Sequence, residues 1–251
     1  MSLKTLKRLP QLMFYAGMIA VTTILVCFLL ATFLNHYPTE LFLPFISLTG
    51  YKAPERYLYA LGFGSAGVLF LYCSYYIHYY ILSFTNLFTK QQISRLFYIL
   101  SSGVVFFMIH AFIPLQDDII TTKTLTIWST IHQSSAGVFF MLVLLHTSFV
   151  FYYTNHNENT FIYFDERATK IRKHCALGCG LTVVLAMVVH PTTVSILGKD
   201  SAKVVSGMAA LAQWILVGLI ILIFVSYSMD VTKILPRIAE SETETHKERK
   251  D

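Results

Sequence analysis

Three histidines, His110, His132 and His190, lie close to the ends of apolar runs in this sequence. Three histidines and an activated water are enough to hold a catalytic zinc ion. Asp117 and Asp118 follow the first of these histidines in a short polar connection. No two of the histidines have the i, i+4 spacing of a helical ligand pair, so the pattern is a weak metal signature. It leaves two hypotheses open, a zinc-dependent hydrolase or acyltransferase and a polar site that binds without catalysis.

The composition shows which elements must position these side chains. Hydrophobic residues make up 55% of the 251 residues, charged residues only 13%, and the mean hydropathy is +0.59. Six runs have few or no charges, and each reaches the roughly 18 residues expected of a membrane span. We therefore predict an all-α polytopic membrane protein with six transmembrane helices at Gln11–Leu34, Tyr57–Phe84, Leu96–Pro114, Ile127–Tyr153, Cys175–Thr192 and Val204–Met229.

The distribution of basic residues predicts the orientation. Most of the 19 Lys and Arg residues fall at the N-terminus, after the second and fourth runs, and in the tail. Because cytoplasmic loops carry the excess of Lys and Arg, both termini should be cytosolic. The expected organisation is a cytosolic N-terminus (1–10), a six-helix domain (11–232) and a charged, disordered cytosolic tail (233–251). Asn155–Lys173 should be a helical linker whose basic end meets anionic headgroups, so no nucleic-acid partner is expected.

Gly62, Gly64 and Gly67 have the spacing of a dinucleotide-binding fingerprint. That fingerprint needs a preceding strand, but these glycines lie inside the second predicted span. Small residues in a membrane helix instead allow a neighbouring helix to approach closely. The same packing role is expected for the small residues of Ser134–Gly137, Ala176–Gly180 and Ser206–Ala212.

The loop His36–Arg56 is unusually apolar and should fold back onto the bundle. Pro54 and Glu55 suit the first turn of the following helix, where a missing N–H costs nothing and a carboxylate is favoured. Consecutive spans run in opposite directions, which places the three histidines at one depth beneath this loop. Ionisable residues at a membrane edge are often functional. The predicted lipid-headgroup or polar site consists of Ser47, Glu55, Arg56, His110, Asp117, Asp118, His132 and His190.

Other polar residues inside the runs have alternative interpretations. His132 and His146 share nearly one face of an ideal helix, which indicates either a proton path or two independent interhelical hydrogen bonds. His78 lies among tyrosines and is interpreted as an interfacial anchor. Cys175 and Cys179 should be packing residues, with palmitoylation of Cys175 as the alternative.

Several short motifs resemble one membrane-protein family. They are PFISLTG followed by PER at the second span, IHQSSAGVFF at Ile131–Phe140, and AQWILVG in the last span. Together they resemble the FGF-receptor-activating protein, damage-regulated autophagy modulator (DRAM) and Sfk family, over roughly Gln11 to Thr232. The PERY form and the basic tail are similar to the post-GPI-attachment factor branch, and the ISLTG form to the autophagy modulators. Gln213 stands where the family's pattern has Glu.

The resemblance implies six spans, cytosolic termini and work on membrane lipids, such as GPI-anchor remodelling, phosphoinositide-kinase regulation, lipid asymmetry or autophagy. We therefore expect a non-catalytic integral membrane protein that binds lipid or supports lipid remodelling, transport or trafficking. Its expected partners are membrane lipids and a larger lipid-handling protein complex, and we assign no catalytic residue, metal ion or cofactor. The alternatives are a zinc-dependent lipid hydrolase or acyltransferase that uses the histidines above, and a structural scaffold.

The final residues, Lys247–Asp251, bear on the compartment. Their basic groups are spaced much like a cytosolic dibasic retrieval signal, with Arg249 in place of a second Lys. With the resemblance to the GPI-remodelling branch, this favours the endoplasmic reticulum or Golgi. The lysosome and the plasma membrane are the alternatives.

Overall fold

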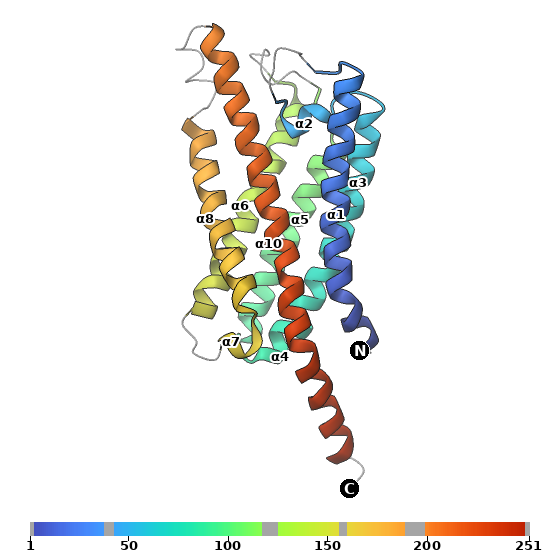
Figure 1. Cartoon of the computed structure of the whole chain (residues 1–251), viewed down its shortest axis with the longest axis vertical. Coiled ribbons are helices and arrows are strands. Elements are labelled where there is room, and N and C mark those ends of the chain that lie inside the picture. The colour runs from blue at the N-terminus through green and yellow to red at the C-terminus, as the bar shows by residue number, and fades with distance from the viewer. Residues whose placement is uncertain (1–2, 38–42, 117–124, 156–159, 189–198, 249–251) are drawn as a thin grey trace.

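The computed structural model describes residues 3–37, 43–116, 125–155, 160–188 and 199–248, and over these ranges it contains helices and no strand (Figure 1). In chain order the elements are α1 (Leu3–Phe33), α2 (Ile46–Thr49), α3 (Glu55–Tyr76), the π-helical segment η1 (Ile77–Leu82), α4 (Ser83–Thr85), α5 (Lys90–Phe112), α6 (Ile127–Asn155), α7 (Thr160–Tyr163), α8 (Glu166–Val188) and α10 (Lys199–Glu248).

The long helices lie side by side along one axis (Figure 1). α1 packs on α3 and α10, α5 packs on α3 and α6, and α8 packs mainly on α10. In the described part of the chain, five segments are long and apolar enough to cross a membrane: Lys4–Phe33, Glu55–Thr85, Lys90–Phe112, Ile127–Asn155 and Ser206–Ser241. The predicted all-α polytopic membrane protein is confirmed. α8 contains most of the predicted span Cys175–Thr192, whose last residues lie outside the described ranges.

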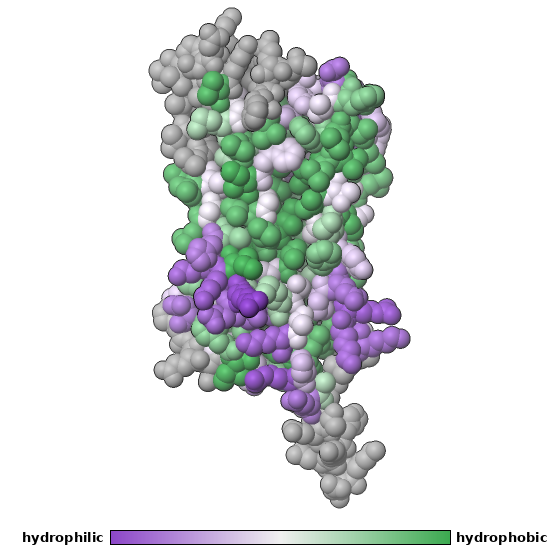
Figure 2. Space-filling model, in the orientation of Figure 1, coloured by the Kyte–Doolittle hydropathy of each residue, from purple (hydrophilic) through white to green (hydrophobic). Residues whose placement is uncertain are grey.

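Both ends of the chain lie at the same end of the bundle, together with α4 and α7 (Figure 1). We call this the terminal end, and the opposite end, which carries α2, the α2 end. Hydrophobic side chains cover the middle of the visible face, while hydrophilic ones gather toward the terminal end (Figure 2). The side of the membrane that each end faces stays a prediction from the basic residues.

Glycines of α3 set its distance from two neighbouring helices. A Cβ added at Gly62 would overlap Thr23 Oγ1 of α1, and one added at Gly67 would lie 2.5 Å from Met108 Cγ of α5. The predicted close helix approach is therefore confirmed in α3. The packing prediction is wrong at Gly137 of α6 and Gly207 of α10, where an added Cβ would meet nothing within 4 Å.

The charged tail differs from the expectation of disorder over 233–251. α10 continues through this segment and ends at Glu248, with Pro236 inside the helix. The residues after Pro236 include Ala, Glu, Lys and Arg, all of which favour helix, and no glycine follows to end it. The first residues of this segment also pack on the bundle, since Ile234 and Ile238 are buried.

Candidate functional site

The loop after α1 docks onto the α2 end of α10. The backbone N–H of Ile46 donates to Gln213 Oε1 at 2.7 Å, and Trp214 Nε1–H donates to the Pro44 carbonyl at 2.8 Å. The predicted fold-back is confirmed for the described residues 43–54. Gln213 needs only an acceptor oxygen for this bond, and an amide supplies one as a carboxylate would. The departure from Glu therefore leaves the docking contact intact.

Glu55, the first residue of α3, is fully buried. His36 Nδ1 lies 2.9 and 3.1 Å from its two carboxylate oxygens. The predicted helix start is confirmed, but the partner was missed, although His36 and Glu55 border the same loop in the sequence. Because Glu55 is buried and paired with His36, it holds the loop to the bundle, and its role in the polar site stays a prediction.

His110 of α5 and His132 of α6 meet at the α2 end, with ring centroids 3.9 Å apart. His110 Nδ1 bonds the His132 carbonyl at 3.1 Å, and His132 Nδ1 bonds the Ile113 carbonyl at 2.7 Å. A carbonyl only accepts, so each Nδ1 carries a hydrogen and each neutral Nε2 is an acceptor. The Tyr59 hydroxyl donates to His110 Nε2 at 2.8 Å. The buried Nε2 of His132 has no partner within the described ranges.

A pocket of about 160 Å³ lies beside His132, between the start of α3 and the end of α5. Arg56 and Tyr57 line it from α3, and both are exposed. Ser47 is buried in α2 and does not line this pocket. The pocket thus brings Arg56 and His132 of the predicted site together, and His110 lies against His132 without lining the pocket. Asp117, Asp118 and His190 lie outside the described residues.

The arrangement does not favour a zinc site. Both ring nitrogens of His110 are engaged, by the His132 carbonyl and the Tyr59 hydroxyl. No group of three His, Cys, Asp or Glu side chains that could hold a metal ion occurs among the residues that the structure describes. A zinc ion on His110 would need the Tyr59 hydrogen bond to break.

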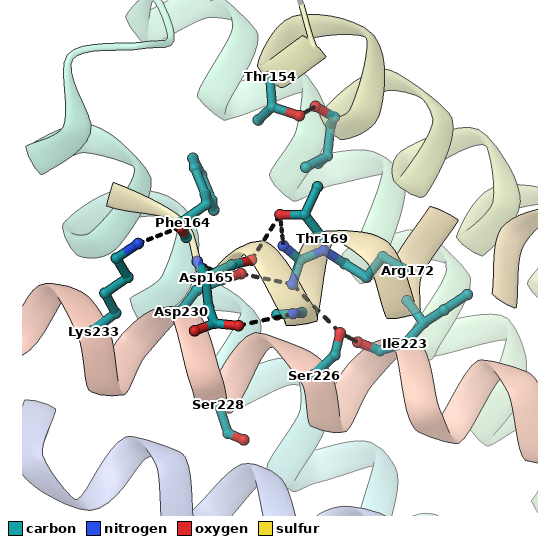
Figure 3. A network of polar contacts seen from close by, with 12 residues as sticks. Thr154, Phe164, Asp165, Thr169, Arg172, Ile223, Ser226, Ser228, Asp230 and Lys233 are labelled. Carbon is teal, nitrogen blue, oxygen red and sulfur yellow. Dashed lines mark hydrogen bonds and ion pairs between the residues drawn. The ribbon is translucent and has the colours of Figure 1, made fainter. Parts of the chain in front are cut away.

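The terminal end contains a buried ion pair that joins α8 to α10 (Figure 3). Arg172 Nη1 and Asp230 Oδ2 lie 2.6 Å apart, close enough for an ion pair although not directed as a hydrogen bond, and both side chains are almost completely buried. Asp230 Oδ1 accepts from the Asp165 N–H at 2.8 Å. The expectation that the basic end of Asn155–Lys173 meets lipid headgroups is therefore wrong for Arg172.

Lys233 of α10 also ties the connection before α8 to the bundle. Its ammonium donates to the Phe161 carbonyl at 2.6 Å and to the Phe164 carbonyl at 2.8 Å, the second of which is drawn in Figure 3. By contrast, Lys170 bonds the exposed Glu166 at 2.7 Å, and this hydrogen bond and its charge lower the pKa of the Glu166 carboxyl. Lys233 therefore has a structural role, whereas Lys170 and Glu166 form a pair at the solvated surface.

A second histidine pair lies deeper toward the terminal end. His78, in η1, is buried, and its Nδ1–H donates to the Ser74 carbonyl at 2.7 Å. Its Nε2 then accepts from His146 Nε2–H at 3.0 Å. Interfacial anchoring is thus the wrong interpretation of His78. His132 and His146 of α6 bond to different helices, which confirms the two independent interhelical contacts.

Cys175 and Cys179 of α8 are both buried. The packing role predicted for them is confirmed. Burial also leaves Cys175 poorly placed for palmitoylation, because a modified thiol has to be reached from the membrane surface.

The fold and the two polar ends define a polytopic helical membrane protein whose buried polar contacts fix one helix to another. A family model described as the Frag1/DRAM/Sfk1/Cwh43P N-terminal domain matches residues 9–234. The chain belongs to this family, as the resemblance of its motifs predicted. Comparison with curated proteins and with solved structures gave no match. The assignment to the GPI-factor branch stays a prediction.

Proposed function

We propose that this protein binds the headgroup of a membrane phospholipid in the α2-end pocket and supports lipid remodelling or transport without catalysing a reaction itself. One observation carries the proposal: exposed Arg56 lines the same pocket as His132, whose buried Nε2 has no partner among the described residues. The Arg56 guanidinium suits a phosphate, which it can bind through two parallel hydrogen bonds. His132 Nε2 offers an acceptor to a hydroxyl or ammonium of the same headgroup.

The chemistry of the pocket also gives a headgroup preference. Phosphatidylethanolamine and phosphatidylcholine both carry a phosphate for Arg56, but only the ethanolamine has N–H groups that can donate to His132 Nε2. A buried acceptor left without a donor costs free energy. The pocket should therefore prefer phosphatidylethanolamine, and it should accept other headgroups that place a hydroxyl or an amine near the phosphate.

Native mass spectrometry of protein released from nanodiscs of equal phosphatidylethanolamine and phosphatidylcholine tests this function. We expect the wild-type protein to retain phosphatidylethanolamine preferentially. Arg56→Gln should weaken retention at least about tenfold, since hydrogen bonds to charged groups contribute about 1.5 to 3 kcal/mol. His132→Phe should keep phosphate binding and lose the preference between the two lipids.

Lys52→Gln is the matched control, because Lys52 is an exposed cation of the same loop that does not line the pocket. Size-exclusion chromatography checks that each variant is folded. Equal retention by the Arg56→Gln and Lys52→Gln variants, or no retained lipid in the wild type, would contradict the proposal.

The same spectra detect protein subunits that remain bound, which tests the proposed larger lipid-handling complex.

The proposed orientation places the terminal end in the cytosol and the α2 end on the other side, as the basic residues favour. Lys52 and Lys170 are both exposed and therefore suit labelling. In sealed cells an impermeant thiol reagent should label a Lys52→Cys variant only from the non-cytosolic side and a Lys170→Cys variant only after permeabilisation. The four native cysteines are buried, so labelling of the unsubstituted protein measures the background. The reverse pattern would overturn the orientation.

We place the protein in the endoplasmic reticulum or Golgi. The spacing of basic groups in the last residues supports this compartment, and family membership supports an integral membrane protein. Residues 249–251 lie outside the described part of the tail.

A further inference from the structure

A second pocket opens between α6 and α8, toward the terminal end, with a volume of about 230 Å³. α8 packs mainly on α10 and makes only slight contact with α6, so these two helices leave a groove between them. Val150 and Phe151 of α6 face Ala176 and Leu177 of α8 across the groove, and Thr169 and Lys173 line the part of it nearest the start of α8.

Among the described residues that line the groove, Lys173 carries the one positive charge without an acidic partner. Arg172 also lines it, but Asp230 neutralises its guanidinium at 2.6 Å (Figure 3). Lys173 is exposed, and its Nζ lies 5.8 Å from the centroid of the Phe151 ring, so the ammonium reaches across from α8 toward α6. The Lys173 ammonium suits a phosphate or carboxylate. The Thr169 hydroxyl is not available to the same anion as a donor, because it already donates to the Asp165 carbonyl at 2.9 Å.

The sides of the groove face hydrocarbon. Leu177 and Leu181 follow Lys173 along α8, and they are 65% and 62% exposed. Large apolar side chains exposed on a membrane-spanning bundle contact lipid, so a ligand in this groove has to carry an acyl chain as well as a negative headgroup. The groove lies toward the end with the most basic residues, where anionic lipids are concentrated if that end is cytosolic.

We infer that the groove between α6 and α8 binds one anionic glycerophospholipid, with its headgroup on Lys173 and an acyl chain along Ala176 and Leu177. This site is separate from the α2-end pocket, because it lies toward the opposite end of the bundle and uses different residues. Its selectivity is for net negative charge, whereas the α2-end pocket selects for a hydrogen-bond donor.

Native mass spectrometry of protein released from phosphatidylcholine nanodiscs that contain phosphatidylserine tests this site. Lys173→Gln should weaken phosphatidylserine retention about fivefold, the effect of one basic residue near the membrane surface. Lys170→Gln is the matched control, because Lys170 is also an exposed cation of α8 but bonds Glu166 and does not line the groove. Ala176→Trp fills the groove and should reduce retention without changing the charge.

Three outcomes would overturn the inference. Equal losses in the Lys173→Gln and Lys170→Gln variants would indicate attraction to the general charge of the surface. Displacement of the lipid by inorganic phosphate alone would indicate an anion site without an acyl-chain groove. Full retention by a folded Ala176→Trp variant would place the lipid elsewhere. The fivefold effect of Lys173→Gln should persist in an Arg56→Gln background, in which the α2-end pocket has lost its phosphate-binding group, so failure at one pocket is distinguishable from failure at the other.

Discussion

Asp230→Asn should lower the free energy of unfolding by about 3 to 5 kcal/mol, the typical cost of breaking a buried ion pair. The amide is nearly isosteric and retains an oxygen that can accept the Asp165 N–H, so packing and that hydrogen bond are preserved. What remains is the Arg172 guanidinium, buried between α8 and α10 without a compensating charge. Unfolding in mixed detergent micelles, followed by circular dichroism, measures the change.

The double variant Arg172→Met, Asp230→Asn separates charge pairing from packing. Replacing both members of a buried pair is often close to neutral, so the double variant should regain most of the stability that Asp230→Asn loses. Lys170→Gln breaks an exposed pair with Glu166 and should leave stability unchanged. A double variant no more stable than Asp230→Asn would contradict the uncompensated Arg172 charge as the cause of the loss.

Gly62→Ala should destabilise the contact between α1 and α3 by about 1 to 3 kcal/mol, the usual cost of overpacking. The added Cβ would overlap Thr23 Oγ1, and two further Thr23 atoms lie within 3 Å of it. Since Ala favours helix over Gly, the loss would be opposed by a smaller propensity gain. The same micelle unfolding experiment measures the net effect.

Gly137→Ala is the control for Gly62→Ala, because an added Cβ there meets nothing within 4 Å. It should be neutral or stabilising, by up to about 1 kcal/mol from helix propensity alone. Thr23→Ala combined with Gly62→Ala should restore part of the lost stability by removing the overlapping hydroxyl. Equal stability of the Gly62→Ala and Gly137→Ala variants would contradict the close approach of α1 and α3.

The positions of the membrane helices could be predicted because their signal is local. Length and hydropathy locate a span whatever its neighbours, and α6 starts at Ile127, the residue at which the apolar run begins. The meeting of His110 and His132 could also be predicted, since consecutive antiparallel spans place the end of one beside the start of the next. The sequence thus determined the helical class, the number of apolar runs and part of the α2-end site.

Only the tertiary structure decided which buried polar groups pair between helices. Arg172 and Asp230 are far apart in the sequence, and the same is true of His78 and His146. Asp230 was a usable signal, because an acidic residue at the edge of the last apolar run requires a partner. To identify that partner, one has to know how each helix is rotated about its axis and which helices lie next to it. Close packing between helices fixes the rotation and the neighbours of each helix. An apolar run with little periodicity predicts neither of them.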